Sequence, residues 1–158
     1  MIARILRFAG FLLFAAAFAL PAIRVPQQDP GQVPGQDTQP GWVCAAFATA
    51  ANGGLSHIAD AGAKGADPVA AVALVLSGWV NPLLLLYLFL CLWPRVVRVR
   101  RVLAVFLLVC IAASWVFFVR AGFTPLIGHF LWVAGVLIAL SPEVLGRWLD
   151  RKATAPAA

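Results

Sequence analysis

Charged side chains are scarce in this sequence, and acidic ones are the scarcest. The 158 residues include 12 basic and 6 acidic side chains, whereas 63% of the residues are hydrophobic. A soluble domain carries about one quarter charged residues, so a chain of this composition folded in water would expose much apolar surface. The mean hydropathy of +0.93 also excludes a disordered or collagen-like chain.

Cysteine and histidine, which supply many catalytic and metal-binding groups, are also few. The three cysteines, Cys44, Cys91 and Cys110, cannot all pair and form no CxxC motif, which excludes a disulfide framework and disfavours a thiol oxidoreductase. The two histidines, His57 and His129, have no accompanying set of metal ligands. We therefore expect no metal and no cofactor.

Four apolar runs dominate the rest of the chain. They cover residues 8–23, 69–93, 102–119 and 123–140, and none of them contains Lys, Arg, Asp or Glu. A helix of about 17 to 25 residues crosses the hydrocarbon layer of a membrane, and it satisfies its backbone hydrogen bonds within the segment, as the absence of water in that layer requires. The sequence predicts an all-α integral membrane four-helix bundle in which residues 1–158 form a single membrane domain.

The basic residues fall mainly on one side of this layout. If the N-terminus is cytoplasmic, nine of the 12 basic residues lie on the inner side, and only Arg24, Lys64 and Arg120 lie outside. This positive-inside bias predicts a multi-pass protein of the bacterial inner membrane with both termini in the cytoplasm, including a cytoplasmic tail at residues 141–158.

The first apolar run has two interpretations. Arg4 and Arg7 precede an apolar stretch that ends near Pro21, a pattern shared by retained helices and by cleaved signal peptides. Leu20 fits poorly where a signal peptidase requires a small residue, although Ala17 and Ala19 fit better. We expect a retained helix, and the other spans do not depend on the outcome.

The outer loop, residues 24–68, has two unlike halves. Residues 27–40 are rich in Gln, Pro and Gly, which predicts a flexible tether. Residues 42–51 are apolar but too short to cross a membrane, and they predict a short outer interfacial helix that lies on the outer leaflet or folds over the bundle as a lid. Gly53 would cap this helix.

The inner basic turn, residues 94–101, places four arginines beside the cytoplasmic headgroups. They are Arg95, Arg98, Arg100 and Arg101. Each contributes about 1 kcal/mol of attraction to anionic lipid, so the bilayer with anionic headgroups on its inner side is the expected partner. A turn held against the membrane has little reach, and we expect no nucleic-acid partner.

A few polar residues interrupt the apolar spans. Ser77 and Asn81 share one helix face, and Pro82 removes a backbone N–H and predicts a helix kink. Ser114 and His129 fall in the outer halves of the last two spans. Together they predict a polar intramembrane cluster open toward the lid. The alternative is plain hydrogen bonding between helices, worth about 0.6 to 2 kcal/mol.

Other patterns carry less information. Small residues spaced by four, which allow helices to approach closely, occur at Ala15/Ala19, Ala73/Ser77 and Gly135/Ala139. Cys44, His57 and Asp60 could be combined into a nucleophilic site, but they are scattered along the outer loop without a local signature. We therefore assign no catalytic residue.

Short strings within this layout carry a resemblance to known proteins. They are GWVCA at residues 41–45, NPLLLLYL at 81–88 and IGHFLWVAG at 127–135. With the four spans, they resemble a type of small bacterial inner-membrane protein with four helices. The size and topology are also similar to those of membrane immunity proteins, which protect a producing cell from pore-forming toxins.

We expect a non-enzymatic membrane protein that acts through helix contacts or its outer loop, for example as an immunity or accessory subunit. Its partner would be another membrane protein or further copies of itself. A small oligomeric transporter or channel lined by Asn81 and His129 is the alternative, although the spans hold no carboxylate. A membrane enzyme with a site at the outer face is a further alternative.

Overall fold

The computed structural model describes residues 2–25, 38–52 and 67–154. This part of the chain is mostly helical. Its α-helices are α1 (Ile2–Ala17), α2 (Gly41–Asn52), α4 (Pro68–Gly78), α5 (Val80–Leu90), α6 (Val97–Ala121) and α7 (Ile127–Thr154). A 3-10 helix, η1 (Pro94–Val96), precedes α6, and three short strands complete the fold: β1 (Pro21–Arg24), β2 (Thr38–Pro40) and β3 (Thr124–Pro125).

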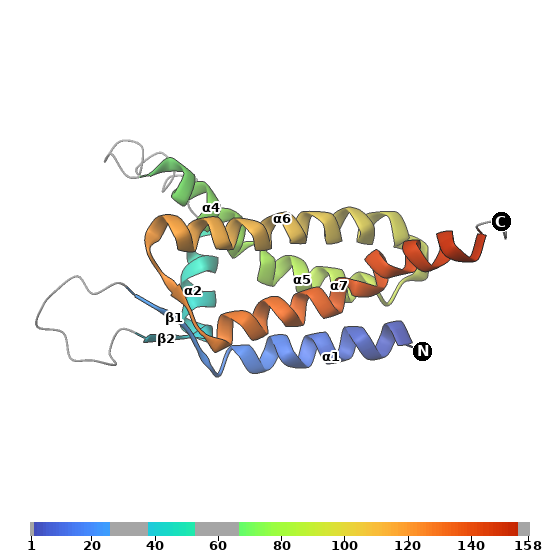
Figure 1. The fold of residues 1–158 in the computed structure, drawn as a ribbon, viewed down its shortest axis with the longest axis horizontal. Helices are drawn as coiled ribbons and strands as arrows, with labels where there is room; N and C mark the ends of the chain where they lie inside the picture. The colour runs from blue at the N-terminus through green and yellow to red at the C-terminus, as the bar shows by residue number, and fades with distance from the viewer. Residues whose placement is uncertain (1, 26–37, 53–66, 155–158) are drawn as a thin grey trace, which may run out of the picture.

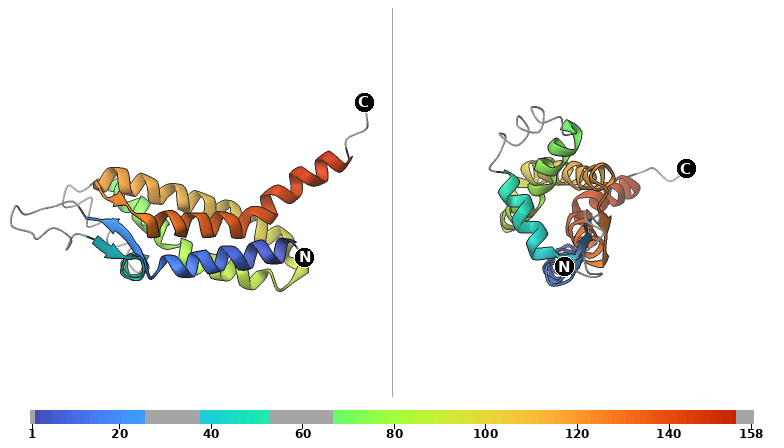
Figure 2. Two further views of the ribbon diagram at one scale, coloured as in Figure 1. Left: turned by 60° about the horizontal axis from the view of Figure 1, so that its bottom comes forward. Right: turned by 90° about the vertical axis from the view of Figure 1, so that its left-hand side faces the viewer.

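The long helices form an elongated bundle (Figure 1). Helix α1 packs along α7, and α6 packs against α4 and α5. Helix α2 crosses one end of the bundle, next to β1 and α4. Both chain termini lie at the opposite end, and the last part of α7 projects away from the other helices there (Figure 2).

Three helical segments are long and apolar enough to cross a membrane: Pro68–Leu90, Val97–Ala121 and Ile127–Val144. Their outer faces are apolar as well; on α6, for example, Val102, Val105 and Val119 are 71%, 63% and 80% exposed. An exposed apolar surface of this kind is suited to lipid rather than to water. The prediction of a helical protein with helices suited to a membrane is therefore confirmed for these three segments.

Several predicted boundaries are wrong. The first run was expected to be helical over 8–23, but α1 ends at Ala17 and Pro21 begins a strand. The last span begins at Ile127 rather than at residue 123, because Thr124–Pro125 is also a strand. In both places a proline follows, and a residue before proline is driven out of helical geometry.

The predicted cytoplasmic tail is not separate from the last span, because α7 continues to Thr154 through Pro142. Proline at this position cannot donate a backbone hydrogen bond to Ile138, four residues earlier. The Ser141 hydroxyl instead donates to the Ile138 carbonyl at 2.7 Å. The side chain thus replaces part of the lost backbone bonding, which allows the helix to continue.

A three-stranded antiparallel sheet, in the order β2-β1-β3, was not predicted. Ile23 pairs with Gln39 of β2 and with Pro125 of β3. The prediction that residues 27–40 form a tether is therefore wrong for Thr38–Pro40, while 27–37 lie outside the described residues. The sheet joins the ends of α1, α2 and α7 at one end of the bundle.

The core lies between α5, α6 and α7, where Leu84, Tyr87, Leu107 and Val136 are fully buried. The Tyr87 hydroxyl donates to the Ala139 carbonyl of α7 at 3.4 Å. These large side chains fill the middle of the bundle and hold its helices together.

Helices α1 and α7 approach each other through small residues. A Cβ atom added to Gly10 would lie 2.5 Å from the Gly135 carbonyl oxygen and from the Ala139 backbone nitrogen. The predicted small pair Gly135/Ala139 is therefore at a close contact with Gly10, whereas the pair Ala15/Ala19 is exposed.

Candidate functional site

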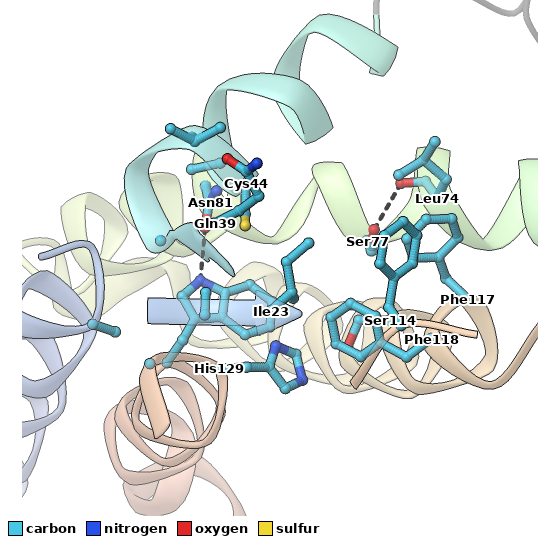
Figure 3. Close-up of a pocket in the computed structure, with 18 of the residues that line it drawn as sticks. Ile23, Gln39, Cys44, Leu74, Ser77, Asn81, Ser114, Phe117, Phe118 and His129 are labelled. Carbon is cyan, nitrogen blue, oxygen red and sulfur yellow. Dashed lines mark hydrogen bonds between the residues drawn. The ribbon is translucent and has the colours of Figure 1, made fainter. Parts of the chain in front are cut away.

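A cavity of about 770 Å³ lies at the end of the bundle that carries α2 and the sheet (Figure 3). We call it the α2 cavity. Small-molecule sites usually have volumes of about 300 to 1,000 Å³, so the α2 cavity is large enough for a ligand. Gln39 and Cys44 lie on one side of it, and Phe117, Phe118 and His129 lie on others.

The walls of the α2 cavity are mainly apolar and come from all six α-helices, of which α1 and α5 contribute one residue each. They include Ala17 of α1, Val43, Cys44 and Ala45 of α2, Ala71, Leu74 and Val75 of α4, Phe117 and Phe118 of α6, and Trp132 of α7. None of the described residues that line the cavity is charged. The site therefore suits apolar groups far better than ions.

The four residues of the predicted polar cluster, Ser77, Asn81, Ser114 and His129, all line the α2 cavity. They come from α4, α5, α6 and α7, so the fold brings together residues that are up to 52 positions apart. The two serines donate within their own helices: Ser77 to the Leu74 carbonyl and Ser114 to the Ile111 carbonyl, each at 2.7 Å. Their oxygens remain in the wall as hydrogen-bond acceptors.

Asn81 has a partner that the sequence analysis did not identify. The Trp132 indole Nε1 donates to the Asn81 side-chain oxygen at 2.9 Å and so joins α7 to α5 (Figure 3). A partly buried indole N–H requires an acceptor, and an asparagine in a span requires a donor. Both requirements can be inferred from the sequence, but the sequence does not show that Trp132 and Asn81 lie close together.

His129 is almost fully buried, with 6% of its surface exposed. It lies among aromatic rings, with ring centroids 4.4 Å from Phe118, 5.3 Å from Trp115 and 5.5 Å from Trp132. Its Nε2 atom is buried and has no hydrogen-bond partner. An unpaired buried nitrogen is unfavourable, so Nε2 of His129 is a polar group whose hydrogen-bonding capacity is unused in this structure.

The helix break associated with Pro82 shapes the same wall. The apolar segment 69–93 divides into α4 and α5 at Trp79, three residues before Pro82. Because Pro82 has no N–H, it cannot bond to the Gly78 carbonyl, and regular helix is interrupted there. The break places Ser77 and Asn81, on either side of it, against the cavity.

Reactive groups are sparse around the α2 cavity. Burial raises the pKa of the Cys44 thiol, which keeps the thiol protonated and a poor nucleophile. His57 and Asp60, its hypothetical partners, lie outside the described residues. Within the described ranges, no group of three or more His, Cys, Asp or Glu residues could hold a metal ion.

A second polar cluster lies at the other end of the bundle, near the chain termini. Glu143 of α7 accepts a hydrogen bond from Arg7 of α1 at 2.9 Å and lies 3.4 Å from Arg100 of α6. The three side chains are only 8%, 17% and 10% exposed, respectively. We call them the Glu143 cluster; it ties three helices together by charge.

The Glu143 cluster corrects two expectations. Arg100 was predicted to contact lipid headgroups with Arg95, Arg98 and Arg101, but it is buried against Glu143. Arg95 and Arg98 are exposed, and Arg101 is partly buried. Glu143 was predicted to lie in the cytoplasmic tail. Its side chain is instead buried, at the end of the candidate span Ile127–Val144, so one candidate span does contain an acidic residue.

Comparisons of this chain with protein-family models, with curated proteins and with solved structures find no match. The resemblance to small four-helix inner-membrane proteins and to immunity proteins therefore stays a prediction. The α2 cavity and the Glu143 cluster provide the basis for proposing a function.

Proposed function

We propose that this chain is a four-span protein of the bacterial inner membrane in which α1 is a retained span. Helix α1 packs along α7, its Gly10 meets the α7 backbone, and its Phe14 is buried in the core. Its 16 residues extend about 24 Å, and the turn that follows adds to this length. A helix so closely packed is a structural part of the bundle, which supports retention over cleavage.

The proposed orientation places both termini in the cytoplasm. The termini share one end of the bundle (Figure 2), as an even number of spans requires. Arg7, Arg95, Arg98 and Arg100 belong to the helix ends and the turn at this same end. Their charge supports a cytoplasmic location, and α2 with its cavity would then face the outside.

Labelling of single cysteines can test this topology. In a variant that lacks native cysteines, Cys at exposed Arg98 should be labelled by an impermeant maleimide only after the cells are broken. Cys at exposed Trp42 should be labelled in intact cells, because α2 would lie outside. N-terminal sequencing should find Ile2 or Met1. The reverse labelling pattern, or a mature chain that begins near Ala22, would reject the topology.

We propose that the protein has no catalytic activity and works by binding at the α2 cavity. The observation that carries this proposal is the large apolar cavity, covered by α2 and lined by no described charged or activated nucleophilic residue. The core of the bundle is filled by large side chains, among which Val80, Leu84 and Leu107 are fully buried. This packing supports a binding site at one end of the bundle rather than a passage through one copy of the chain.

An accessory or immunity subunit would use this end of the molecule to bind a membrane partner or its ligand. Filling the cavity with Ala45→Trp should therefore abolish binding, since Ala45 lines the cavity, while Ala46→Trp on the exposed side of α2 should not. Native mass spectrometry of protein purified in mild detergent should detect a retained ligand or partner in the parent and in Ala46→Trp. A parent protein that carries nothing would refute the binding function.

A further inference from the structure

We infer that the α2 cavity binds an uncharged, lipid-like molecule whose single hydroxyl or carbonyl oxygen forms a hydrogen bond with Nε2 of His129. This inference rests on the proposed binding function and specifies the chemical class of the ligand. Three features of the cavity support it: the absence of charge among its described lining residues, the unpaired His129 nitrogen, and its aromatic and aliphatic walls.

The ligand must be uncharged because the cavity offers no opposite charge. All of the described lining residues are apolar or neutral polar ones. Moving an ammonium, phosphate or carboxylate group into such surroundings without a charged partner is strongly unfavourable. A fatty acid in its ionised form or a phospholipid headgroup would therefore bind much more weakly than an alcohol of the same chain length.

The oxygen of the ligand is positioned by His129. Gln39 of β2 also lines the cavity, but within the predicted polar cluster Ser77 and Ser114 donate to carbonyls of their own helices, and Asn81 accepts from Trp132. The Nε2 atom of His129 has no partner and is covered by neighbouring side chains, in a residue that is only 6% exposed, so the ligand oxygen reaches it only after the His129 ring turns among its aromatic neighbours. A hydroxyl can pair with Nε2 as donor or acceptor, and a carbonyl can accept when Nε2 carries the proton.

The rest of the ligand must be apolar. Phe117 and Phe118 stand on one wall, with Leu74 and Val75 of α4 and Val43 of α2 on others (Figure 3 shows Leu74, Phe117, Phe118 and His129). Contact of an aliphatic or prenyl chain with these side chains removes apolar surface from contact with water at the outer end of the bundle. A purely polar metabolite would gain nothing from these walls.

Three probes with the same chain length separate these requirements. Radiolabelled 1-hexadecanol is bound to the purified full-length protein in nanodiscs, and hexadecane or palmitate at pH 8 is added as competitor at equal amounts in the bilayer. We expect hexadecanol to bind about threefold to tenfold more tightly than hexadecane, as one hydrogen bond to a buried group predicts. Palmitate should compete least.

Two substitutions at His129 test the role of its nitrogen. His129→Phe keeps a ring among Trp115, Phe118 and Trp132 but removes Nε2, so it should bind hexadecanol and hexadecane equally. His129→Gln keeps a hydrogen-bonding group and should keep part of the preference for the alcohol. An unchanged circular dichroism spectrum and elution volume would show that both variants are folded.

The outcomes separate this inference from the proposed function. If hexadecane and palmitate compete as well as hexadecanol, or if His129→Phe keeps the preference for the alcohol, the assignment of the ligand class is wrong while binding at the cavity stands. If no probe binds and Ala45→Trp changes nothing, binding at the cavity is itself wrong, and this inference is overturned with it.

Discussion

Replacement of Glu143 by glutamine is expected to destabilise the bundle by about 3 to 5 kcal/mol, the usual effect of removing one partner from a buried ion pair. The carboxylate is 8% exposed and faces two arginines, Arg7 at 2.9 Å and Arg100 at 3.4 Å. Without it, two guanidinium groups from different helices would remain close together with no opposite charge. The free energy of unfolding can be measured by titration with SDS, followed by circular dichroism.

The matched control is Asp67→Asn. Asp67 pairs with Arg120 at 3.4 Å, but these side chains are 35% and 55% exposed. An exposed ion pair contributes only about 0.2 to 1 kcal/mol. At the start of α4, the Val69 backbone N–H donates a hydrogen bond of 2.9 Å to the Asp67 side chain. An asparagine side chain can accept the same hydrogen bond. Equal losses in the two variants would show that the Glu143 cluster does not hold the helices together.

The helical segments could be predicted because each of them corresponds to a continuous apolar stretch of the sequence. Three of the four apolar runs lie in helices that are long and apolar enough to cross a membrane, and the apolar stretch 42–51 forms α2. The ends of the runs were less reliable, because hydropathy does not distinguish a helix from a short strand. Pro21 and Thr124 carry no charge and so do not interrupt the apolar runs 8–23 and 123–140, yet both residues lie in the sheet.

The sheet and the charge cluster depend on contacts between distant segments, which no local pattern contains. Ile23 pairs with Pro125, 102 positions later, and Arg7 bonds to Glu143, 136 positions later. The separation of Arg100 from its neighbours in the basic turn also depends on a distant residue. Within this arginine-rich helix end, Arg100 is the side chain that pairs with Glu143.

The polar side of the α2 cavity was more accessible to prediction. Ser77 and Asn81 are one helical turn apart, and polar groups within spans tend to turn toward other helices. All four residues of the predicted cluster do line the cavity. The sequence did not indicate which of the four side chains would find a hydrogen-bond partner. The Trp132 indole donates to Asn81, whereas Nε2 of His129 has no partner.

Replacement of Gly10 by alanine is expected to weaken or break the contact between α1 and α7. The new Cβ would lie 2.5 Å from two backbone atoms of α7, the Gly135 oxygen and the Ala139 nitrogen. Backbone atoms of a packed helix cannot move aside as a flexible side chain can, so the helices must separate. Overpacking of this kind destabilises by about 1 to 3 kcal/mol, and more where the whole helix is displaced.

The same variant also tests whether α1 belongs to the mature protein. Ala15→Leu, on the exposed side of α1, is the control and should change the free energy of unfolding by less than about 0.5 kcal/mol in the SDS titration. If α1 were removed as a signal peptide, Gly10→Ala and Ala15→Leu would both leave the stability of the mature chain unchanged. A loss confined to Gly10→Ala therefore requires that α1 stays in place against α7, since a helix that is absent cannot transmit a steric clash to it.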